Sequence, residues 1–410
     1  MNSSRVIFIN RFFYPDYSAT AQILSDVAFG LTRRGLSVSV ISSRLLYEAP
    51  QAKLRRRETI EGVDVIRIQT TRFGRSGLAG RAIDYMTFYI SCLFALIKHV
   101  RRGDVVVFKT DPPLLSVPLG VAARMRGAVI VNWLQDIFPE TAQALGMKMA
   151  GPLLGGILKR LRNRSLQKAA ITVVIGKRMA EYVAACGVAQ ERIVEIPNFC
   201  DDIAIQPRSF LKNPLRAAWG LTHQDFVLGY SGNLGRAHDL RTILGAAEAL
   251  KAYTDIKFLF IGGGQLRQTL EVEVRARGLA SVILKPYQPR EQLELSLCVP
   301  DVHWVSLRPQ LEGFILPSKL YGIAAAGRPV LMIGDPQGEI GRIVSEHGMG
   351  TVVPIGAAET LASRILSWKR TPGLIDGMGQ RARSYIDNSA SRALAIDRWF
   401  KLVRNLMPAA

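Results

Sequence analysis

Residues 226–249 read FVLGYSGNLGRAHDLRTILGAAEA, and this stretch decides the fold. It opens with a short apolar run, Phe226–Tyr230, which is typical of a strand buried on both faces of a sheet. A turn with two glycines follows, and from about Leu240 the pattern predicts a helix. A buried strand, a glycine turn and a helix in this order are the repeating unit of an α/β sheet.

The same alternation recurs along the whole chain of 410 residues. Most of the apolar runs are continuous, as expected for strands of a parallel sheet. Further strands are predicted at Val6–Asn10, Val38–Ser42, Val63–Ile68, Asp104–Lys109, Ala128–Trp133, Ile171–Ile175, Ile193–Ile196, Lys257–Ile261, Val282–Leu284, Val302–Ser306, Pro329–Ile333 and Gly350–Val353. Amphipathic stretches such as Ala21–Arg33 and Lys177–Cys186 are predicted to be helices between them. The pattern indicates an α/β protein with doubly wound sheets.

Three prolines that cluster between residues 197 and 214 indicate a domain boundary. We expect one Rossmann-like domain over residues 1–205 and a second over residues 206–388, each large enough for its own core. Residues 389–410 are predicted to form a helix, anchored by Trp399, that packs back on the first domain. Two such domains facing each other across a cleft would bind ligands at the carboxyl ends of their strands.

The composition indicates a globular protein that attracts anions. Lysine and arginine number 53 against 33 for aspartate and glutamate, so the formal net charge is +20. Such a charge favours nucleic acids, acidic lipids or phosphorylated substrates as partners. The four cysteines lie at no metal-binding spacing, and we expect free thiols in a reducing compartment. Neither G-x-x-x-x-G-K-[ST] nor G-x-G-x-x-G occurs, which argues against P-loop chemistry and against a nicotinamide-dependent oxidoreductase.

The turn after the strand Phe226–Tyr230 suits a phosphate group. Its glycines let the backbone approach a ligand closely, and the N-terminus of the following helix offers free N–H groups and a partial positive charge. Two side chains of the turn would add positive charge. A plain tight turn is the alternative, and the junction Gly262–Gly264 has the same two interpretations. The candidate binding residues are Gly232, Asn233, Gly235, Arg236 and His238.

The segment LEGFILPSKLY, residues 311–321, follows another predicted strand. Lys319 falls in the first turn of a predicted helix, where a cation opposes the helix dipole by under about 1 kcal/mol. A bound anion would offset this effect. Glu312 could accept hydrogen bonds from sugar hydroxyls, although a solvated surface would explain both charges. The candidates are Glu312, Gly313, Phe314, Ile315, Leu316, Pro317, Ser318 and Lys319.

Polar side chains also follow strands of the first domain. Asp136 and Glu140 come after the strand Ala128–Trp133, at the end where a second substrate would bind. Asp136 could contact a hydroxyl group or accept its proton, or it could cap a helix instead. Further candidates after the first strand are Tyr14, Asp16 and Thr20.

The apolar stretch Tyr85–Ile97 lies between cationic residues, and it is too short to span a bilayer. Apolar and aromatic residues flanked by cations suit an anionic membrane surface, where each cation contributes about 1 kcal/mol. A core helix with a solvated cationic face is the alternative. The cations are Lys53, Arg55, Arg56, Arg57, Arg72, Arg75, Arg81, Lys98, Arg101 and Arg102.

Together these motifs resemble the retaining glycosyltransferases of family 4, which have the GT-B fold. The resemblance covers nearly the whole chain, and it is closest to the subgroup that builds colanic acid and O-antigen repeat units. The order of the motifs is specific, whereas each motif alone is weak. The motifs are Arg11–Pro15 with Arg34-Gly35, Asp136–Glu140, Pro197–Asp201, Glu312–Phe314, Pro317–Tyr321 and Ala325–Val330.

The resemblance implies transfer of a sugar from a nucleotide sugar, with retention at the anomeric carbon, to a polyprenyl-diphosphate-linked saccharide. It implies neither cofactor nor metal: Lys319 and Arg236 would stabilise the departing diphosphate, since no Asp-x-Asp is present. Glu312 would orient the donor sugar. The expected location is the inner face of the cytoplasmic membrane, reached from the cytoplasm, in synthesis of exopolysaccharide or lipopolysaccharide O-antigen.

One position departs from the family pattern. The family commonly carries a second glutamate that holds the ribose, eight positions after the first. Leu320 or Gly322 occupies that place here, depending on the direction of counting, and neither side chain accepts a hydrogen bond. The sequence therefore names no residue for the ribose.

Two other functions remain open. A non-hydrolysing nucleotide-sugar epimerase would have the same two-domain architecture and would need no acceptor. A basic protein that binds nucleic acid is allowed by the charge, although no helix-turn-helix, zinc finger or RNP-type aromatic motif is present. We expect no nucleic-acid partner.

Overall fold

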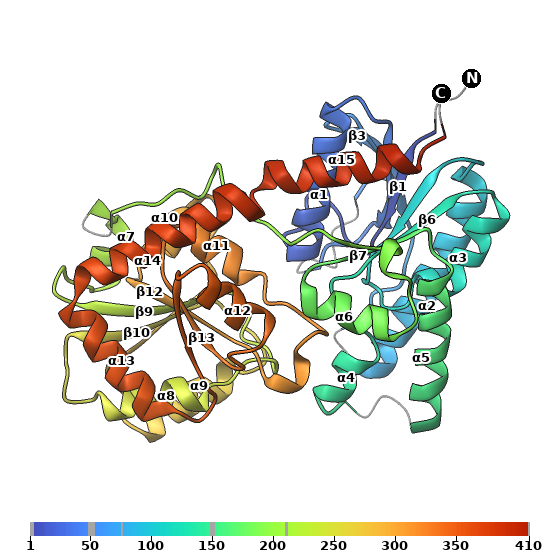
Figure 1. Ribbon diagram of the computed structural model, residues 1–410. Coiled ribbons are helices and arrows are strands. Elements are labelled where there is room, and N and C mark those ends of the chain that lie inside the picture. The colour runs from blue at the N-terminus through green and yellow to red at the C-terminus, as the bar shows by residue number, and fades with distance from the viewer. Residues whose placement is uncertain (1–3, 48–53, 75–76, 148–151, 210–211, 409–410) are drawn as a thin grey trace. The chain divides into compact units, whose positions relative to one another are not determined.

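The structure is a computed structural model that describes residues 4–47, 54–74, 77–147, 152–209 and 212–408. The chain divides into two compact units, each built on its own sheet (Figure 1). The first unit comprises Met1–Pro197, Gly313–Ile315 and Ala393–Ala410, and the second comprises Asn198–Glu312 and Leu316–Arg392. Two of the predicted cations, Lys53 and Arg75, lie outside the described residues.

The sheet of the first unit has the order β3-β4-β2-β1-β5-β6-β7-β8. Among its described strands, β3 runs antiparallel to its neighbour and the others pair in parallel. Its strands are β1 (Val6–Ile9), β2 (Val38–Ser43), β3 (Arg57–Ile60), β4 (Val63–Ile68), β5 (Val105–Phe108), β6 (Val129–Trp133), β7 (Ile171–Val174) and β8 (Ile193–Glu195). Its helices are α1 (Ala19–Arg33), α2 (Leu78–His99), α3 (Ser116–Met125), α4 (Glu140–Ala144), α5 (Pro152–Gln167), α6 (Lys177–Ala185) and α15 (Arg392–Leu406).

The second unit has an all-parallel sheet with the order β11-β10-β9-β12-β13-β14. Its strands are β9 (Phe226–Ser231), β10 (Ile256–Ile261), β11 (Val282–Lys285), β12 (Val302–Ser306), β13 (Val330–Ile333) and β14 (Gly350–Val353). Its helices are α7 (Pro214–Ala218), α8 (Arg241–Ala249), α9 (Arg267–Ala276), α10 (Leu293–Leu297), α11 (Lys319–Ala325), α12 (Glu339–Glu346), α13 (Ala358–Arg370) and α14 (Pro372–Tyr385). The predicted α/β class with two doubly wound sheets is confirmed.

The structure adds one strand to those predicted. β3 pairs antiparallel with β4, and the burial of its four residues alternates between exposed and partly buried. The strand reads RETI, which has no apolar run. A short strand at a sheet edge needs no such run, so a search for buried parallel strands passes over it.

Both sheets reverse their strand order beside their first strand. β1 lies between β2 and β5, and β9 lies between β10 and β12. In open α/β sheets, ligands bind outside the carboxyl ends of the strands at such a switch point. The residues that follow β1 and β5 in the first unit, and β9 and β12 in the second, are thus placed for function.

Helix α2 packs on the first sheet with one face and exposes the other. Phe88, Cys92 and Leu96 are buried in the core with strands β1 and β5. Over Ala79–His99 the helix is long and apolar enough to cross a membrane by length and composition alone, and 28% of its most apolar window is buried. The helix extends beyond both ends of the apolar stretch Tyr85–Ile97, which alone is too short to span a bilayer.

The C-terminal helix α15 packs on the first unit. The Trp399 ring lies 4.5 Å from the Trp133 ring and 6.0 Å from the Phe8 ring, centroid to centroid. The helix begins at Arg392 rather than at Ser389, because a π-helical turn over Ile386–Ala390 precedes it.

Candidate active site

Lys319 lies at the switch point of the second sheet. It begins helix α11, and its Nζ lies 3.4 Å from His238 Nε2 and 5.2 Å from the centre of the Tyr230 ring. A Cβ atom added to Gly232 would lie 2.9 Å from Lys319 Cε, and φ of Gly232 is +120°. Glycine is therefore favoured at position 232 by its backbone conformation, and the Lys319 side chain lies against it.

His238 orients the lysine instead of adding charge. Its Nδ1 lies 2.7 Å from the Ser306 carbonyl oxygen, so Nδ1 carries the proton and Nε2 is free to accept from Lys319. Burial and the charge of Lys319 lower the pKa of His238 to about 3. In the ligand-free protein His238 is therefore neutral near pH 7, and a positive charge on it toward a bound anion stays a prediction. Burial also lowers the pKa of Lys319, to about 8.

The two glycine turns predicted from the sequence form one surface. Gly232 N–H donates to the Ile261 carbonyl at 2.9 Å, and Leu234 N–H donates to the Gly263 carbonyl at 2.7 Å. A Cβ atom on Gly264 would lie 2.3 Å from Asn233 Oδ1, and φ of Gly264 is +122°. Asn233 and Arg236 are exposed on this surface, and Gly235 is partly buried.

Glu312 occupies the N-terminus of helix α12. Its Oε2 accepts the Glu339 N–H at 3.0 Å, and a Cβ atom on Gly338 would lie 2.2 Å from Oε1. The carboxylate is thus held in the second unit by a backbone contact that the sequence did not suggest. This contact neither requires nor excludes a bond to a sugar hydroxyl.

The remaining residues of the Glu312–Lys319 segment divide between the two units. Gly313, Phe314 and Ile315 belong to the first unit, where the Ile137 N–H donates to the Phe314 carbonyl at 2.8 Å. Leu316 is buried, Pro317 is partly buried, and Ser318 is the N-cap of α11 without a side-chain bond. Leu320 is fully buried, so no polar side chain stands at either family position for the ribose.

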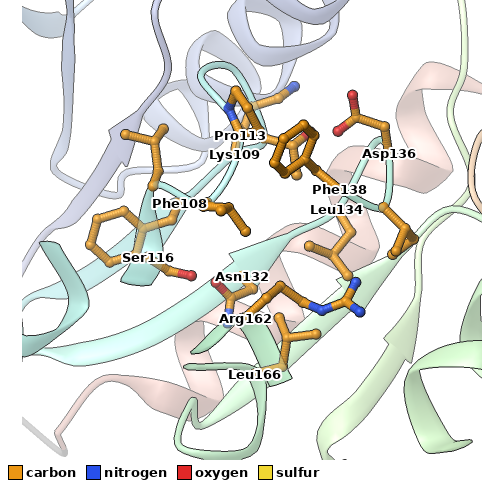
Figure 2. Close-up of a pocket in the computed structure, with 14 residues that line it drawn as sticks. Phe108, Lys109, Pro113, Ser116, Asn132, Leu134, Asp136, Phe138, Arg162 and Leu166 are labelled. Atoms are coloured by element: carbon orange, nitrogen blue, oxygen red, sulfur yellow. The ribbon is translucent and has the colours of Figure 1, made fainter. Parts of the chain in front are cut away.

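Asp136 lies at the carboxyl edge of the first sheet, beyond β6. It lines a small cavity of about 30 Å³ together with Lys109, Thr110 and Asn132 (Figure 2). One of its oxygens, Oδ1, is buried without a hydrogen-bond partner. Burial raises the pKa of Asp136, and a hydrogen bond from Thr110 and the charge of Lys109 oppose the rise. Asp136 caps no helix, since α4 starts at Glu140 with Pro139 as its N-cap.

Sequence reasoning missed two charged neighbours of Asp136. Lys109 is 2% exposed, and burial lowers its pKa to about 7 against the opposing charges of Asp111 and Asp136. Burial also raises the pKa of Asp111, to about 6. Both residues follow β5 directly, so their place after a buried strand beside β1 was the available signal. The predicted strand Asp104–Lys109 instead includes the lysine, so the sequence pattern treats Lys109 as part of a strand and not as a site residue.

The structure gives Glu140 and Asp16 structural partners. Glu140 is buried and accepts from Arg162 Nη2 at 2.8 Å and from the Tyr182 hydroxyl at 2.5 Å. Asp16 accepts the N–H groups of Ser18 at 2.8 Å and Tyr47 at 2.5 Å. Both carboxylates are buried and bound within the first unit, and their predicted contacts to a substrate stay predictions.

The other two predicted residues after β1 remain accessible. Tyr14 is exposed, and Thr20 is partly buried in the first turn of α1. The Thr20 carbonyl oxygen accepts the Lys109 ammonium at 3.0 Å, which ties this turn to the Asp136 neighbourhood. Among the residues that the structure describes, no group of three or more His, Cys, Asp or Glu side chains is arranged to hold a metal ion.

Comparison with known proteins identifies the family of the chain. Residues 19–198 match the glycosyl transferase 4-like domain, and residues 212–385 match the glycosyl transferases group 1. The chain is 26% identical to the probable glycosyltransferase WbjE of Pseudomonas aeruginosa over 76% of its own length and 77% of that protein. It is 25% identical to the putative colanic acid biosynthesis glycosyl transferase WcaI of Escherichia coli K12, over 79% of this chain and 80% of that one.

Solved structures share the fold at lower identity. Sucrose-phosphate synthase of Thermosynechococcus elongatus superposes with a TM-score of 0.76 at 16% identity, covering 98% of this chain and 99% of that one. HepE of Anabaena, solved in complex with UDP-glucose, gives a TM-score of 0.72 at 13% identity over 98% of this chain and 99% of that one. The chain therefore belongs to the glycosyltransferases of family 4, with a glycosyl transferase 4-like domain and a group 1 domain in the GT-B fold.

Proposed function

We propose that the protein is a retaining glycosyltransferase that moves a sugar from a nucleoside diphosphate sugar to a hydroxyl group of a lipid-linked saccharide. The names of the relatives WbjE and WcaI and the UDP-glucose bound to HepE support this assignment. The observation that carries it is the Lys319 ammonium beside the Gly232 turn, at the switch point of the second sheet. The product belongs to a bacterial surface polysaccharide such as an exopolysaccharide, O-antigen or colanic acid.

The departing diphosphate is stabilised by fixed positive charge. With His238 accepting one N–H of the Lys319 ammonium, two N–H groups remain for phosphate oxygens. Arg236, exposed on the same turn, is the second cation. Each such contact is worth about 2.7–4 kcal/mol in the transition state, by analogy with an oxyanion donor. Glu312 contacts the donor sugar in this proposal.

The reaction exchanges one bond for another at the anomeric carbon. The bond from that carbon to the diphosphate oxygen breaks, and its electron pair leaves with the nucleoside diphosphate. The acceptor oxygen forms the new bond on the same face of the sugar, and its proton passes to Asp136. No divalent ion takes part, so we expect transfer to continue in the presence of EDTA. Loss of transfer with EDTA and its return with Mg²⁺ or Mn²⁺ would contradict this.

Nucleotide binding to three variants tests the assignment of Lys319. UDP, GDP and dTDP are titrated calorimetrically into the wild type, and the best ligand is then titrated into Lys319→Gln, Lys319→Arg and Lys251→Gln. We expect Lys319→Gln to weaken binding and to lower turnover at least tenfold, with partial recovery in Lys319→Arg. Lys251 is exposed in the second unit, so its variant should bind like the wild type. Equal affinity in all four proteins removes Lys319 from the site.

A donor-only assay separates transfer from epimerisation. A glycosyltransferase requires the acceptor before the nucleoside diphosphate is released in quantity. A nucleotide-sugar epimerase would convert the donor with no acceptor present. Appearance of an epimeric nucleotide sugar without acceptor therefore rejects the proposal.

We also propose that the first unit docks on the inner face of the cytoplasmic membrane. Helix α3 packs against both α2 and α5, and the three helices expose apolar side chains. Phe94 is 68% exposed and Met125 is 84% exposed. We call this surface the α2–α3–α5 face; its exposed apolar residues are Ile83, Met86, Ile90, Phe94, Ile97, Val121, Met125, Leu153, Leu154, Ile157 and Leu161.

Cations accompany the α2–α3–α5 face, which favours an anionic bilayer over a protein partner. Arg81 and Lys98 lie exposed on α2, and Arg160 and Arg164 lie exposed on α5. Such a surface would bring the enzyme to an acceptor carried on a polyprenyl lipid.

Sedimentation with vesicles tests the membrane proposal. The wild type should sediment with phosphatidylglycerol vesicles and not with phosphatidylcholine vesicles. The double variant Ile90→Glu/Phe94→Glu should sediment clearly less than the wild type, because both changed side chains are exposed and enter the bilayer in this proposal. Val272→Glu changes an equally exposed apolar residue of the second unit and should behave like the wild type. Binding unchanged in the double variant would reject the α2–α3–α5 face.

A further inference from the structure

A buried lysine and two carboxylates meet at the carboxyl edge of the first sheet, and the transfer reaction described above does not use the lysine. Lys109 follows β5 at the switch point beside β1, and its backbone N–H donates to the Ile9 carbonyl at 3.1 Å. Its ammonium lies 3.8 Å from the centre of the Trp133 ring and donates to the Thr20 carbonyl at 3.0 Å. Strand β6 and helix α1 thus hold the Lys109 side chain beneath the edge.

Lys109 and Asp136 line the same small cavity. Figure 2 shows the lysine ammonium and the Asp136 carboxylate on the same side of it, with Asn132 and Arg162 on the other. The buried Asp136 Oδ1 has no hydrogen-bond partner. The Lys109 ammonium and Asp136 therefore interact through a region with little water, where charges act strongly on one another.

We propose that Lys109 is a positioning residue for Asp136: its ammonium keeps the Asp136 carboxylate ionised, against the negative charge of Asp111, so that Asp136 can accept a proton from the acceptor hydroxyl. The inference rests on the proposed function, because it assigns Lys109 a role only through Asp136. The inference also assigns Asp111 the opposite effect to Lys109 on the ionisation of Asp136. Removing either residue should therefore change the acidity of Asp136, and the two changes should have opposite signs.

The other charged groups of this region come from the segment after β1, from α2 and from α5. From α5, Arg162 lines the same cavity and donates to Glu140 at 2.8 Å. After β1, Asp16 adds negative charge near Asp111, and Arg11 adds positive charge. From α2, Asp84 pairs with Arg11 at 3.2 Å, and Tyr85 lies within the influence of Asp111 and Asp136. These groups remain in place in the variants below, so that each variant changes one charge.

The pH dependence of the transfer rate tests the proposal. The acid limb of kcat/KM for the acceptor reports the ionisation of the free enzyme's essential base. In Lys109→Met this limb should move up by about one pH unit, because the carboxylate loses its cation. In Asp111→Asn it should move down, and in Lys109→Arg it should stay near the wild-type position. A general loss of fold lowers the rate without moving the limb in opposite directions.

Asp104→Asn is the matched control. Asp104 precedes the same strand at its other end, where it pairs with Arg5 at 3.3 Å. The control removes a buried charge next to the start of β5 and should leave the acid limb in place. Acid limbs that coincide in Lys109→Met, Asp111→Asn and the wild type would overturn the proposal. Should Lys109→Met fail to fold, Asp111→Asn and Lys109→Arg still decide the question.

Two readouts separate this inference from the proposed function. UDP binding should be unchanged in Lys109→Met and Asp111→Asn, because the nucleotide residues belong to the second unit. Carbon-13 titration of labelled aspartate, with Asp136 assigned by its absence in Asp136→Asn, follows the same ionisation without any transfer reaction. If the wild type shows no transfer but the titration moves up in Lys109→Met and down in Asp111→Asn, the proposed function fails and the coupling stands. A titration unmoved in both variants rejects the coupling.

Discussion

At the scale of single residues, the contact between Gly338 and Glu312 tests how the donor-side carboxylate is held. Gly338 has φ of −68°, so alanine is allowed there by its backbone, but the added Cβ would lie 2.2 Å from Glu312 Oε1. Gly338→Ala should therefore displace the carboxylate and lower both the transfer rate and the free energy of unfolding. In a Glu312→Ala background the same methyl group contacts no carboxylate, so Gly338→Ala should lower the free energy of unfolding only slightly.

Urea denaturation of the wild type, the two single variants and the double variant gives the interaction energy between positions 312 and 338. We expect an interaction energy of about 0.5–3 kcal/mol, the range for residues in contact. Strictly additive effects of the two substitutions would show that Glu312 does not lie at the N-terminus of α12 in solution.

Lys319 should couple nucleotide binding to proton uptake. Burial places its pKa at about 8 in the free protein, so above pH 8 most molecules carry a neutral amine. A diphosphate favours the ammonium and raises this pKa, so binding takes up a proton and the affinity falls as pH rises from 7.5 to 9.5. The fall approaches tenfold per pH unit above pH 8.

Calorimetry in two buffers of different ionisation enthalpy measures the proton directly. Lys319→Arg stays charged throughout this range, so it should bind with no such uptake. An affinity for UDP that is constant between pH 7.5 and 9.5 in the wild type would show that no group near pKa 8 meets the diphosphate.

At the scale of elements, the strands with continuous apolar runs could be predicted, and the one without such a run could not. Within the described residues, thirteen of the fourteen strands match a predicted run, because parallel strands covered on both faces are mostly apolar. β3 was not predicted because it is an edge strand that pairs with β4 alone and has no buried apolar run. Helix ends were harder to predict than strands. The π-helical turn before α15 leaves no signal in the spacing of apolar residues.

The packing of α15 gives an element-scale prediction. Trp399 is fully buried against Trp133 and Phe8, whereas the neighbouring Phe400 is partly buried beside Arg34. Trp399→Ala should lower the free energy of unfolding by about 3–5 kcal/mol, the usual loss for a buried tryptophan. Phe400→Ala should cost clearly less. Urea denaturation followed by circular dichroism measures both, and equal losses would contradict the described packing.

At the scale of the whole molecule, candidate site residues could be predicted only where they belong to a recognisable sequence motif. Lys319, Gly232 and Arg236 stand in glycine turns and a helix start that the sequence displays. Glu140 and Asp16 look like equally good candidates in the sequence, yet their carboxylates serve Arg162 and backbone N–H groups. Lys109 and Asp111 carry no motif. Which polar groups find internal partners is decided by contacts between segments far apart in the chain, and a single sequence does not show them.

The net charge of +20 and the α2–α3–α5 face should contribute to vesicle binding in separable ways. Raising the salt from 50 to 500 mM shortens the screening length several-fold and weakens the attraction between cations and anionic lipid, while apolar insertion persists. The wild type should therefore bind phosphatidylglycerol vesicles less tightly at 500 mM salt but still measurably. In Ile90→Glu/Phe94→Glu only the electrostatic part is left, so binding should vanish at 500 mM. If the wild type is released completely by salt and binds duplex DNA with the same salt dependence, charge alone explains its association, and the nucleic-acid alternative replaces the membrane.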